Sequence, residues 1–310
     1  MKQIGSWLVP FFSLAICLSL SGCNTVNANN GRPKVLRYAF SPNSEQMEGG
    51  QLRRDLMQKY LQSQLHMPVE VISVIGYGPT IEAMRTEKVD LATFGSLSYI
   101  IAAQKAGAQA IAAHGFADGS LGGYRSVIAV PKNSPIRSLQ DLKAQAKDIV
   151  FAFADPASTS GNLYPRVGLL DAGIEPEKDF KKVVYAGNHM AAALTVESGK
   201  VGAAGFMERM ITTLVGRNKL APDDVRVIWT SDLIPNSCYA VRKGLSEELK
   251  NQIQTALLEI PARDPELLAH LNSLSRSPAR GTKIVAVNDA TYDGLRRYTS
   301  KVKDFNFVEE

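Results

Sequence analysis

The chain alternates short runs of β-branched and other apolar residues with longer segments in which apolar residues recur at helical spacing. The strand-like runs include residues 69–75, 91–94, 126–130 and 149–154, and the segment over residues 96–106 is typical of a helix. Repeated units of this kind predict an α/β fold with mostly parallel sheets and helices on both faces. These units form two series, and the second starts near residue 126. The sequence has no fixed-period repeat, and no low-complexity linker separates the two series. We therefore predict two lobes that share crossing strands, with a cleft between them.

The N-terminus has the layout of a secretory signal. A positive charge at Lys2 precedes an apolar stretch over residues 4–20, which ends in Leu20-Ser21-Gly22-Cys23. This tetrapeptide resembles a bacterial lipobox, which implies cleavage before Cys23 and attachment of diacylglycerol and palmitate there. The alternative is a cytosolic protein with a hydrophobic N-terminal helix. We predict a signal peptide over 1–22, a polar Asn-rich tether over 23–32, and a body held to a membrane outside the cytoplasm.

Composition and motifs exclude several classes of protein. The 35 basic and 30 acidic residues give a net charge of +5 without a basic block, so no nucleic-acid partner is expected. Three cysteines without a Cys-x-x-Cys pair cannot form a disulfide framework or a zinc site, and the four histidines lack metal-binding spacing. Gly-x-Ser-x-Gly and a Walker motif are also missing from the sequence. We expect no enzyme, no catalytic residue, no metal and no cofactor, and we interpret Cys238, in a strand-like run, as a buried structural thiol.

Three consecutive hydroxyl residues stand at a strand-to-helix junction. Ser158, Thr159 and Ser160 follow the apolar run 149–154 and precede a helical segment over 163–172. The start of a helix carries unpaired N–H groups and a partial positive charge, and hydroxyls add further donors for an oxyanion. A simple Ser/Thr N-cap is the alternative.

Two segments of the second half carry a more specific resemblance. Residues 138–143 (SLQDLK) and 155–161 (DPASTSG) resemble the second-lobe signature of the phosphate/phosphite/phosphonate-binding proteins of ABC transporters, and weaker similarities extend it over most of 35–245. The resemblance implies the two-lobed type II periplasmic-binding fold, with a ligand cleft between the lobes. It also implies delivery of the ligand to permease subunits that a separate ATPase drives. We place the first lobe at residues 33–124 plus 240–310 and the second at residues 125–239.

The same resemblance implies a set of ligand-binding residues. They lie at the turn after the second strand, at the crossing between lobes, in the hydroxyl segment and at two later strand-to-helix junctions: Tyr77, Tyr124, Ser158, Thr159, Ser160, His189 and Glu208. A one-residue gap would put Arg209 in place of Glu208, and that choice stays open. Tyr99 is a weaker candidate that we expect to pack in the interior.

One difference between this chain and that family bears on the identity of the ligand. Members that take aminoalkylphosphonates tend to carry an aspartate where this chain has Asn236 and Ser237. Without that charge the expected ligand is a smaller one, namely phosphite, methylphosphonate or hydrogen phosphate, although Glu208 could compensate. Two alternatives remain open: a binding protein for a sulfonate or another small anion, and an envelope enzyme that acts on phosphate esters.

Overall fold

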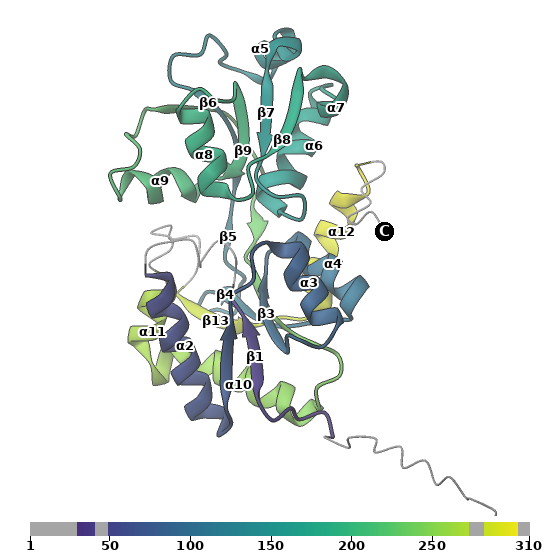
Figure 1. Ribbon diagram of the computed structural model, residues 1–310, viewed down its shortest axis with the longest axis vertical. Coiled ribbons are helices and arrows are strands. Elements are labelled where there is room, and N and C mark those ends of the chain that lie inside the picture. The colour runs from purple at the N-terminus through teal and green to yellow at the C-terminus, as the bar shows by residue number, and fades with distance from the viewer. Residues whose placement is uncertain (1–29, 41–48, 273–281, 303–310) are drawn as a thin grey trace, which may run out of the picture.

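The polypeptide folds into two α/β lobes that lie one above the other along the longest axis (Figure 1). The computed structural model describes residues 30–40, 49–272 and 282–302. The proposed signal peptide, Cys23 and most of the tether lie outside these ranges. None of the helices within them has the length and apolar character that crossing a bilayer requires.

The first lobe is built on a six-stranded sheet with the order β13-β4-β12-β3-β1-β2. Before the chain leaves the lobe, its elements are β1 (Leu36–Ala39), α2 (Gly50–Leu65), β2 (Val69–Ile72), α3 (Tyr77–Arg85), β3 (Leu91–Phe94), α4 (Ser96–Ala106) and β4 (Gln109–Gly115). After its return they are β12 (Cys238–Val241), α10 (Glu247–Arg263), α11 (Pro265–Asn272), β13 (Lys283–Ala286), η4 (Asp289–Tyr292) and α12 (Asp293–Thr299).

The second lobe is built on a five-stranded sheet with the order β10-β6-β9-β7-β8. Its first elements are β6 (Ser126–Pro131), α5 (Leu139–Ala144), η1 (Ala146–Asp148), β7 (Val150–Phe153), η2 (Thr159–Leu163), α6 (Tyr164–Asp171) and α7 (Pro176–Asp179). Its last elements are β8 (Lys182–Tyr185), α8 (His189–Glu197), β9 (Ala203–Met207), α9 (Arg209–Val215) and β10 (Val225–Thr230). Ser138 caps α5, because its side chain accepts the N–H of Asp141.

Two short strands carry the chain between the lobes. β5 (Gly123–Tyr124) leads into the second lobe and β11 (Ile234–Pro235) leads back. They pair antiparallel with each other, with Ile234 opposite Tyr124, and form the narrow waist of the molecule (Figure 1). The residue limits that we gave the lobes stay a prediction.

Both sheets are mixed, so the expectation of mostly parallel sheets is wrong. β12 runs antiparallel to both of its neighbours, β3 and β4, and β6 runs antiparallel to β9 and β10. These two strands enter their lobes from the waist and run outward. The strands of the βα units, such as β3 and β7, run toward the waist and bring their carboxyl ends there, which is where open α/β sheets bind ligands.

An apolar cluster joins the lobes on one side of the waist. It contains Leu97 and Ile100 of α4 together with Leu163, Tyr164 and Val167 of the second lobe. Separate clusters fill the remainder of each lobe. The lobes are therefore in contact beside the junction that carries the hydroxyl residues.

Candidate functional site

The hydroxyl segment lies buried where β7 gives way to η2. Ser158, Thr159 and Ser160 are 2%, 2% and 1% exposed. The side chain of Ser158 caps η2 by accepting the N–H of Gly161 at 3.0 Å, and the Ser126 hydroxyl donates to the Ser160 carbonyl at 2.6 Å. η2 is a turn of π-helix that continues into α6. Its first N–H groups have no partner within the helix, as at every helix start.

His189 is held in one tautomer behind this segment. It is the first residue of α8, after the N-cap Asn188. Its Nδ1 accepts the N–H of Met207 at 3.1 Å, so in the neutral ring Nε2 carries the proton and donates to Ser158 Oγ, 3.3 Å away. Burial, and next the charge of Arg209, lower the pKa of His189 to about 3. The ring is therefore a neutral donor at physiological pH.

The three hydroxyls keep their own protons available for donation. A hydroxyl oxygen has two acceptor positions, and those of Ser158 Oγ are taken by Gly161 N–H and the His189 ring. Thr159 Oγ1 accepts the N–H of Leu97 from the first lobe at 2.9 Å. Ser160 Oγ is buried and forms no hydrogen bond of good geometry. A group of donors of this kind suits an anion with several oxygens.

Tyr77 and Tyr124 join the hydroxyl segment, one from the first lobe and one from the waist. A Cβ added to Gly95 would lie 3.6 Å from Tyr77 Oη and 3.4 Å from Thr159 Oγ1, so both oxygens approach one point. The Tyr124 phenol faces the hydroxyls of Ser160 and Thr159. Burial, the largest cause, raises the pKa of Tyr124, so its phenol stays protonated and can donate.

The structure does not bring Glu208 to these residues. Its side chain is exposed, and its backbone is engaged: the N–H donates to the Arg125 carbonyl at 2.9 Å and the carbonyl accepts the N–H of Ile211 at 3.1 Å. The next residue, Arg209, points inward, with its guanidinium Cζ 4.7 Å from the centre of the Tyr124 ring. Consecutive residues at a helix start project in directions about 100° apart, so a shift of one residue exchanges a carboxylate for a guanidinium. Of the two choices that the sequence left open, Arg209 is the residue beside the hydroxyl segment.

Sequence reasoning missed a contact between the lobes at Asp155. This carboxylate, just before the hydroxyl segment, accepts the N–H of Ala157 at 2.8 Å and the N–H of Tyr77 at the start of α3. Burial, the largest cause, raises its pKa, and the two N–H groups oppose that shift. Asp155 thus caps a helix of the opposite lobe, as Thr159 does for α4. The Asp-Pro turn in the sequence is the signal that could have suggested a cap.

Asn236 and Cys238 have structural roles. The Asn236 amide donates to the His114 carbonyl at 2.9 Å, inside the first lobe. Cys238 is fully buried in β12, and burial raises the pKa of its thiol to about 12, which makes it unreactive. The interpretation of Cys238 as a structural thiol is confirmed.

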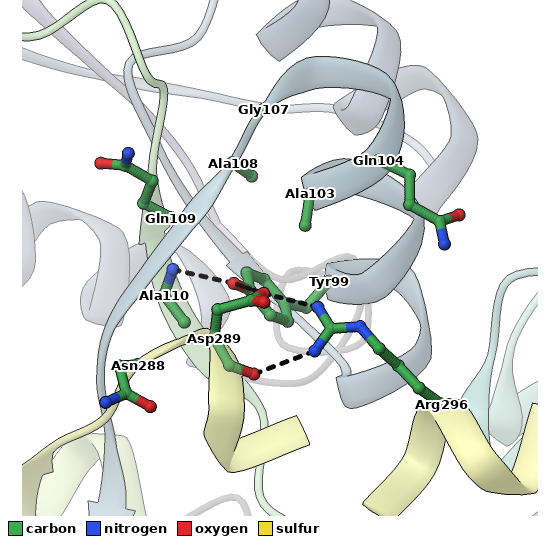
Figure 2. Close-up of a pocket in the computed structure, with 10 residues that line it drawn as sticks. All are labelled: Tyr99, Ala103, Gln104, Gly107, Ala108, Gln109, Ala110, Asn288, Asp289 and Arg296. Atoms are coloured by element: carbon green, nitrogen blue, oxygen red, sulfur yellow. Dashed lines mark hydrogen bonds and ion pairs between the residues drawn. The ribbon is translucent and has the colours of Figure 1, made fainter. Parts of the chain in front are cut away.

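A separate cavity of about 540 Å³ lies between α4 and the segment that carries Asp289 and Arg296 (Figure 2). Tyr99 lines it, and its hydroxyl donates to Asp289 at 2.6 Å while its ring packs against Tyr292. Arg296 in the same cavity is paired with Asp289 and with Asp293. Tyr99 packs as expected, and the paired Arg296 is a poor receptor for an anion. Within the described residues, no group of three or more potential ligands is placed to hold a metal ion.

Comparison with known proteins places the chain in a family. A family model described as "ABC transporter, phosphonate, periplasmic substrate-binding protein" matches residues 38–292. The phosphonates-binding periplasmic protein of Escherichia coli is 36% identical over 222 residues, which cover 72% of this chain and 65% of that protein, just under two thirds. The phosphate-import protein PhnD of Mycolicibacterium smegmatis is 28% identical over 278 residues, covering 86% of this chain and 85% of the relative.

Solved structures agree with this placement. The crystal structure of a binding protein component of an ABC phosphonate transporter from Pseudomonas aeruginosa superposes with a TM-score of 0.75 and 27% identity, and the match covers 85% of each chain. The two lobes, each with its own sheet, are those of the type II periplasmic-binding fold, as predicted. Proteins of this family are not enzymes; they bind the substrates of a transporter, and they do so outside the cytoplasm. The chain belongs to the periplasmic substrate-binding proteins of phosphonate ABC transporters.

Proposed function

We propose that the protein captures a small phosphorus oxyanion, namely phosphite, methylphosphonate or phosphate, between its two lobes. The observation that carries this proposal is the buried set of hydroxyls at residues 158–160, in which the oxygens of Ser158 and Thr159 accept N–H groups of the fold, so that their hydroxyl protons can be donated. Tyr77, Tyr124 and the neutral His189 would add donors around the same ligand. A tetrahedral oxyanion, with several acceptor oxygens, matches a set of converging donors.

The names of relatives support a phosphorus ligand. The E. coli relative is named for phosphonates and the M. smegmatis relative for phosphate import. A ligand ammonium would need a carboxylate partner. Asn236 is engaged with the backbone of the first lobe and Glu208 points to solvent, so neither supports an aminoalkylphosphonate as the ligand.

We further propose that the loaded protein delivers its ligand to the permease subunits of an ABC importer, while a separate ATPase supplies the energy. A ligand that contacts both lobes stabilises the arrangement in which they touch, and a transporter can recognise that arrangement. In this proposal Cys23 carries the lipid that holds the protein at a membrane, with residues 23–32 as the tether. The lobes are residues 33–124 plus 240–310 and residues 125–239.

Calorimetric titration of the purified protein tests the ligand assignment. The panel is phosphite, methylphosphonate, phosphate, aminoethylphosphonate, sulfate and methanesulfonate. We expect the first three to bind more tightly than the amino compound and the sulfur anions. Preferred binding of a sulfonate would replace the proposal with a sulfonate-binding function, and preferred binding of aminoethylphosphonate would overturn the ligand class.

The anchor is tested separately from the ligand. We expect Cys23→Ala to move the protein from the membrane fraction to the soluble fraction when the full chain is expressed in a bacterium. Mass spectrometry of the wild-type N-terminal peptide should detect diacylglycerol on Cys23. An unchanged fraction together with an unmodified peptide would refute the anchor and leave the ligand proposal standing.

A further inference from the structure

Arg209 carries a charge that nothing in the described part of the protein neutralises at short range. Its Nη1 is buried and forms no hydrogen bond. Two other largely buried arginines have carboxylate partners: Arg166 pairs with Glu177 at 2.7 Å and Arg242 with Asp90 at 2.7 Å. A guanidinium nitrogen that is removed from water without such a partner is costly, so a position of this kind indicates a ligand that supplies the missing charge.

The guanidinium lies against the residues proposed to bind the oxyanion. It stacks over the ring of Tyr124, whose phenol faces the hydroxyls of Ser160 and Thr159. It is also close enough to His189 to lower the pKa of that ring. Burial lowers the pKa of Arg209 itself, but an arginine remains charged at any physiological pH.

The other groups proposed to contact the ligand are neutral. His189 is an uncharged donor, and the hydroxyls of Ser158, Thr159, Ser160 and the tyrosines carry no charge. The Asp155 carboxylate is not one of these groups, because it already accepts the N–H groups of Ala157 and Tyr77. The hydroxyls respond to the shape of a tetrahedral anion. Among the residues that the structure describes, Arg209 is the one charged group beside them, so it responds to the amount of negative charge on the ligand.

We propose that Arg209 is the residue that selects a doubly charged phosphorus oxyanion over singly charged and zwitterionic anions of the same shape. The inference rests on the proposed function of the site and names the charge state of its ligand. A dianion gains about twice the Coulomb attraction of a monoanion at the same distance. An aminoalkylphosphonate brings an ammonium toward a cation, and that repulsion disfavours it.

The experiment compares two ligands of the same shape. Methylphosphonate and methanesulfonate each carry one methyl group and three oxygens, but in mildly alkaline buffer the first holds two negative charges and the second holds one. Both are titrated by calorimetry into the wild-type protein and into Arg209→Gln, Arg209→Lys and Arg137→Gln. Arg137 is exposed and comes two residues before α5, the helix at the end of the second lobe far from the waist (Figure 1). Its replacement controls for the loss of one positive charge.

We expect Arg209→Gln to weaken methylphosphonate binding roughly 10- to 100-fold, the range of one charge-assisted contact. Methanesulfonate binding should fall much less, so the ratio of the two affinities collapses. Arg209→Lys should restore part of that ratio, because it keeps the charge and loses the planar fork. Arg137→Gln should leave the ratio at the wild-type value.

Other outcomes separate the two proposals. If wild-type protein binds methylphosphonate but Arg209→Gln weakens both ligands equally, Arg209 only supports Tyr124 and the inference is overturned. If wild-type protein binds neither ligand nor phosphate, the proposed function itself fails. A thermal melt of each variant shows whether it is folded, and the Arg209→Lys ratio still decides the question if Arg209→Gln does not fold.

Discussion

At the scale of single residues, the proposed site is made of side chains whose oxygen lone pairs accept hydrogen bonds from the fold, which leaves their protons available to the proposed ligand. Ser158 caps η2 and holds the His189 ring, and Thr159 accepts an N–H from α4. Ser160 differs, since its hydroxyl forms no hydrogen bond of good geometry although it is 1% exposed. A buried polar group without a partner costs stability, which points to a role in binding.

Ser160→Ala should therefore separate binding from stability. Because Ser160 Oγ forms no hydrogen bond of good geometry, we expect the free energy of unfolding to stay the same or to rise by up to about 1 kcal/mol. Affinity for methylphosphonate should fall about tenfold, since one donor to a charged ligand is removed. Ser126→Ala is the matched control. Its hydroxyl donates to the Ser160 carbonyl, so we expect it to lower the unfolding free energy by about 1 kcal/mol. Urea unfolding and calorimetry on both variants would contradict this if Ser160→Ala cost stability and left affinity unchanged.

The buried His189 predicts a specific dependence of stability on pH. Its pKa is lowered to about 3 in the folded protein, while an unfolded histidine titrates near a pKa of about 6.5. Below pH 6.5 the unfolded state binds a proton that the folded state refuses, so stability falls as the pH drops toward 3. Between pH 7 and pH 5 the loss from this residue is roughly 2 kcal/mol.

Urea unfolding of wild type and His189→Gln at the two pH values measures this loss. Glutamine does not titrate, so the fall in unfolding free energy between pH 7 and pH 5 should be smaller in the variant. The exposed His66, replaced by asparagine, checks that the effect belongs to the buried ring. An equal fall in wild type and His189→Gln would show that the ring is protonated in the folded protein.

At the scale of helices and strands, the hydroxyl segment depends on a close approach that only a glycine allows. A Cβ on Gly161 would overlap the Cβ of Ala154 at the end of β7 and would come within 2.9 Å of both Ser158 Oγ and His189 Cε1. The first turn of η2 therefore rests directly on the strand that precedes it. This contact sets the positions of the cap and of the hydroxyls together.

Gly161→Ala should damage both the fold and the site. We expect a loss of about 1–3 kcal/mol in unfolding free energy from overpacking, and a loss of ligand binding because Ser158 and His189 must move apart. Gly78→Ala is the control within another helix, α3, where an added Cβ meets no atom within 4 Å. It should keep wild-type affinity and raise stability by up to about 1 kcal/mol. Thermal melts and calorimetry would refute the prediction if the two alanine variants behaved alike.

The sequence predicted most of these helices and strands, but not the pairing and direction of all strands. Local patterns predicted β3 and α4, because hydrophobic spacing depends on neighbouring residues. They missed β4, whose Ala-rich sequence has low strand propensity and is held by pairing with β12 and β13. They also missed the antiparallel entry of β6 and β12, which depends on how the chain crosses between lobes.

The candidate site could be predicted where its residues are consecutive in the sequence. It was uncertain where the position of a residue on a helix decides which way its side chain points. The segment 158–160 could be identified because three hydroxyls follow an apolar strand, and His189 because the family resemblance implies a histidine at that strand-to-helix junction. The choice between Glu208 and Arg209 could not be made, because one residue of helical phase decides which side chain points inward. The contact from Asp155 to α3 spans two lobes, and no local pattern encodes it.

At the scale of the whole molecule, the C-terminal helix ties the lobes together beside the site. Tyr292 at the end of η4 and Leu295 of α12 pack on the first lobe, yet Tyr298 of α12 stacks on Tyr164 of α6 with ring centres 4.3 Å apart and planes 15° apart. Past the end of α12, Lys301 Nζ lies 3.5 Å from Asp171 at the other end of α6. α6 continues directly from η2, so this contact holds the helix that carries the hydroxyl segment.

Tyr298→Ala should accordingly favour separation of the lobes. A stacked pair of this kind contributes about 0.5–1.5 kcal/mol, and apparent affinity falls in proportion to the population of the binding-competent form. We expect methylphosphonate affinity to fall up to about tenfold, with a larger radius of gyration by small-angle X-ray scattering without ligand and a wild-type radius at saturation. Arg297→Ala changes an exposed residue of the same helix and should resemble wild type in both measurements. If Tyr298→Ala kept the wild-type radius and affinity, the stack would be a passive contact, and closure would depend on the ligand and the helix caps from Asp155 and Thr159 alone.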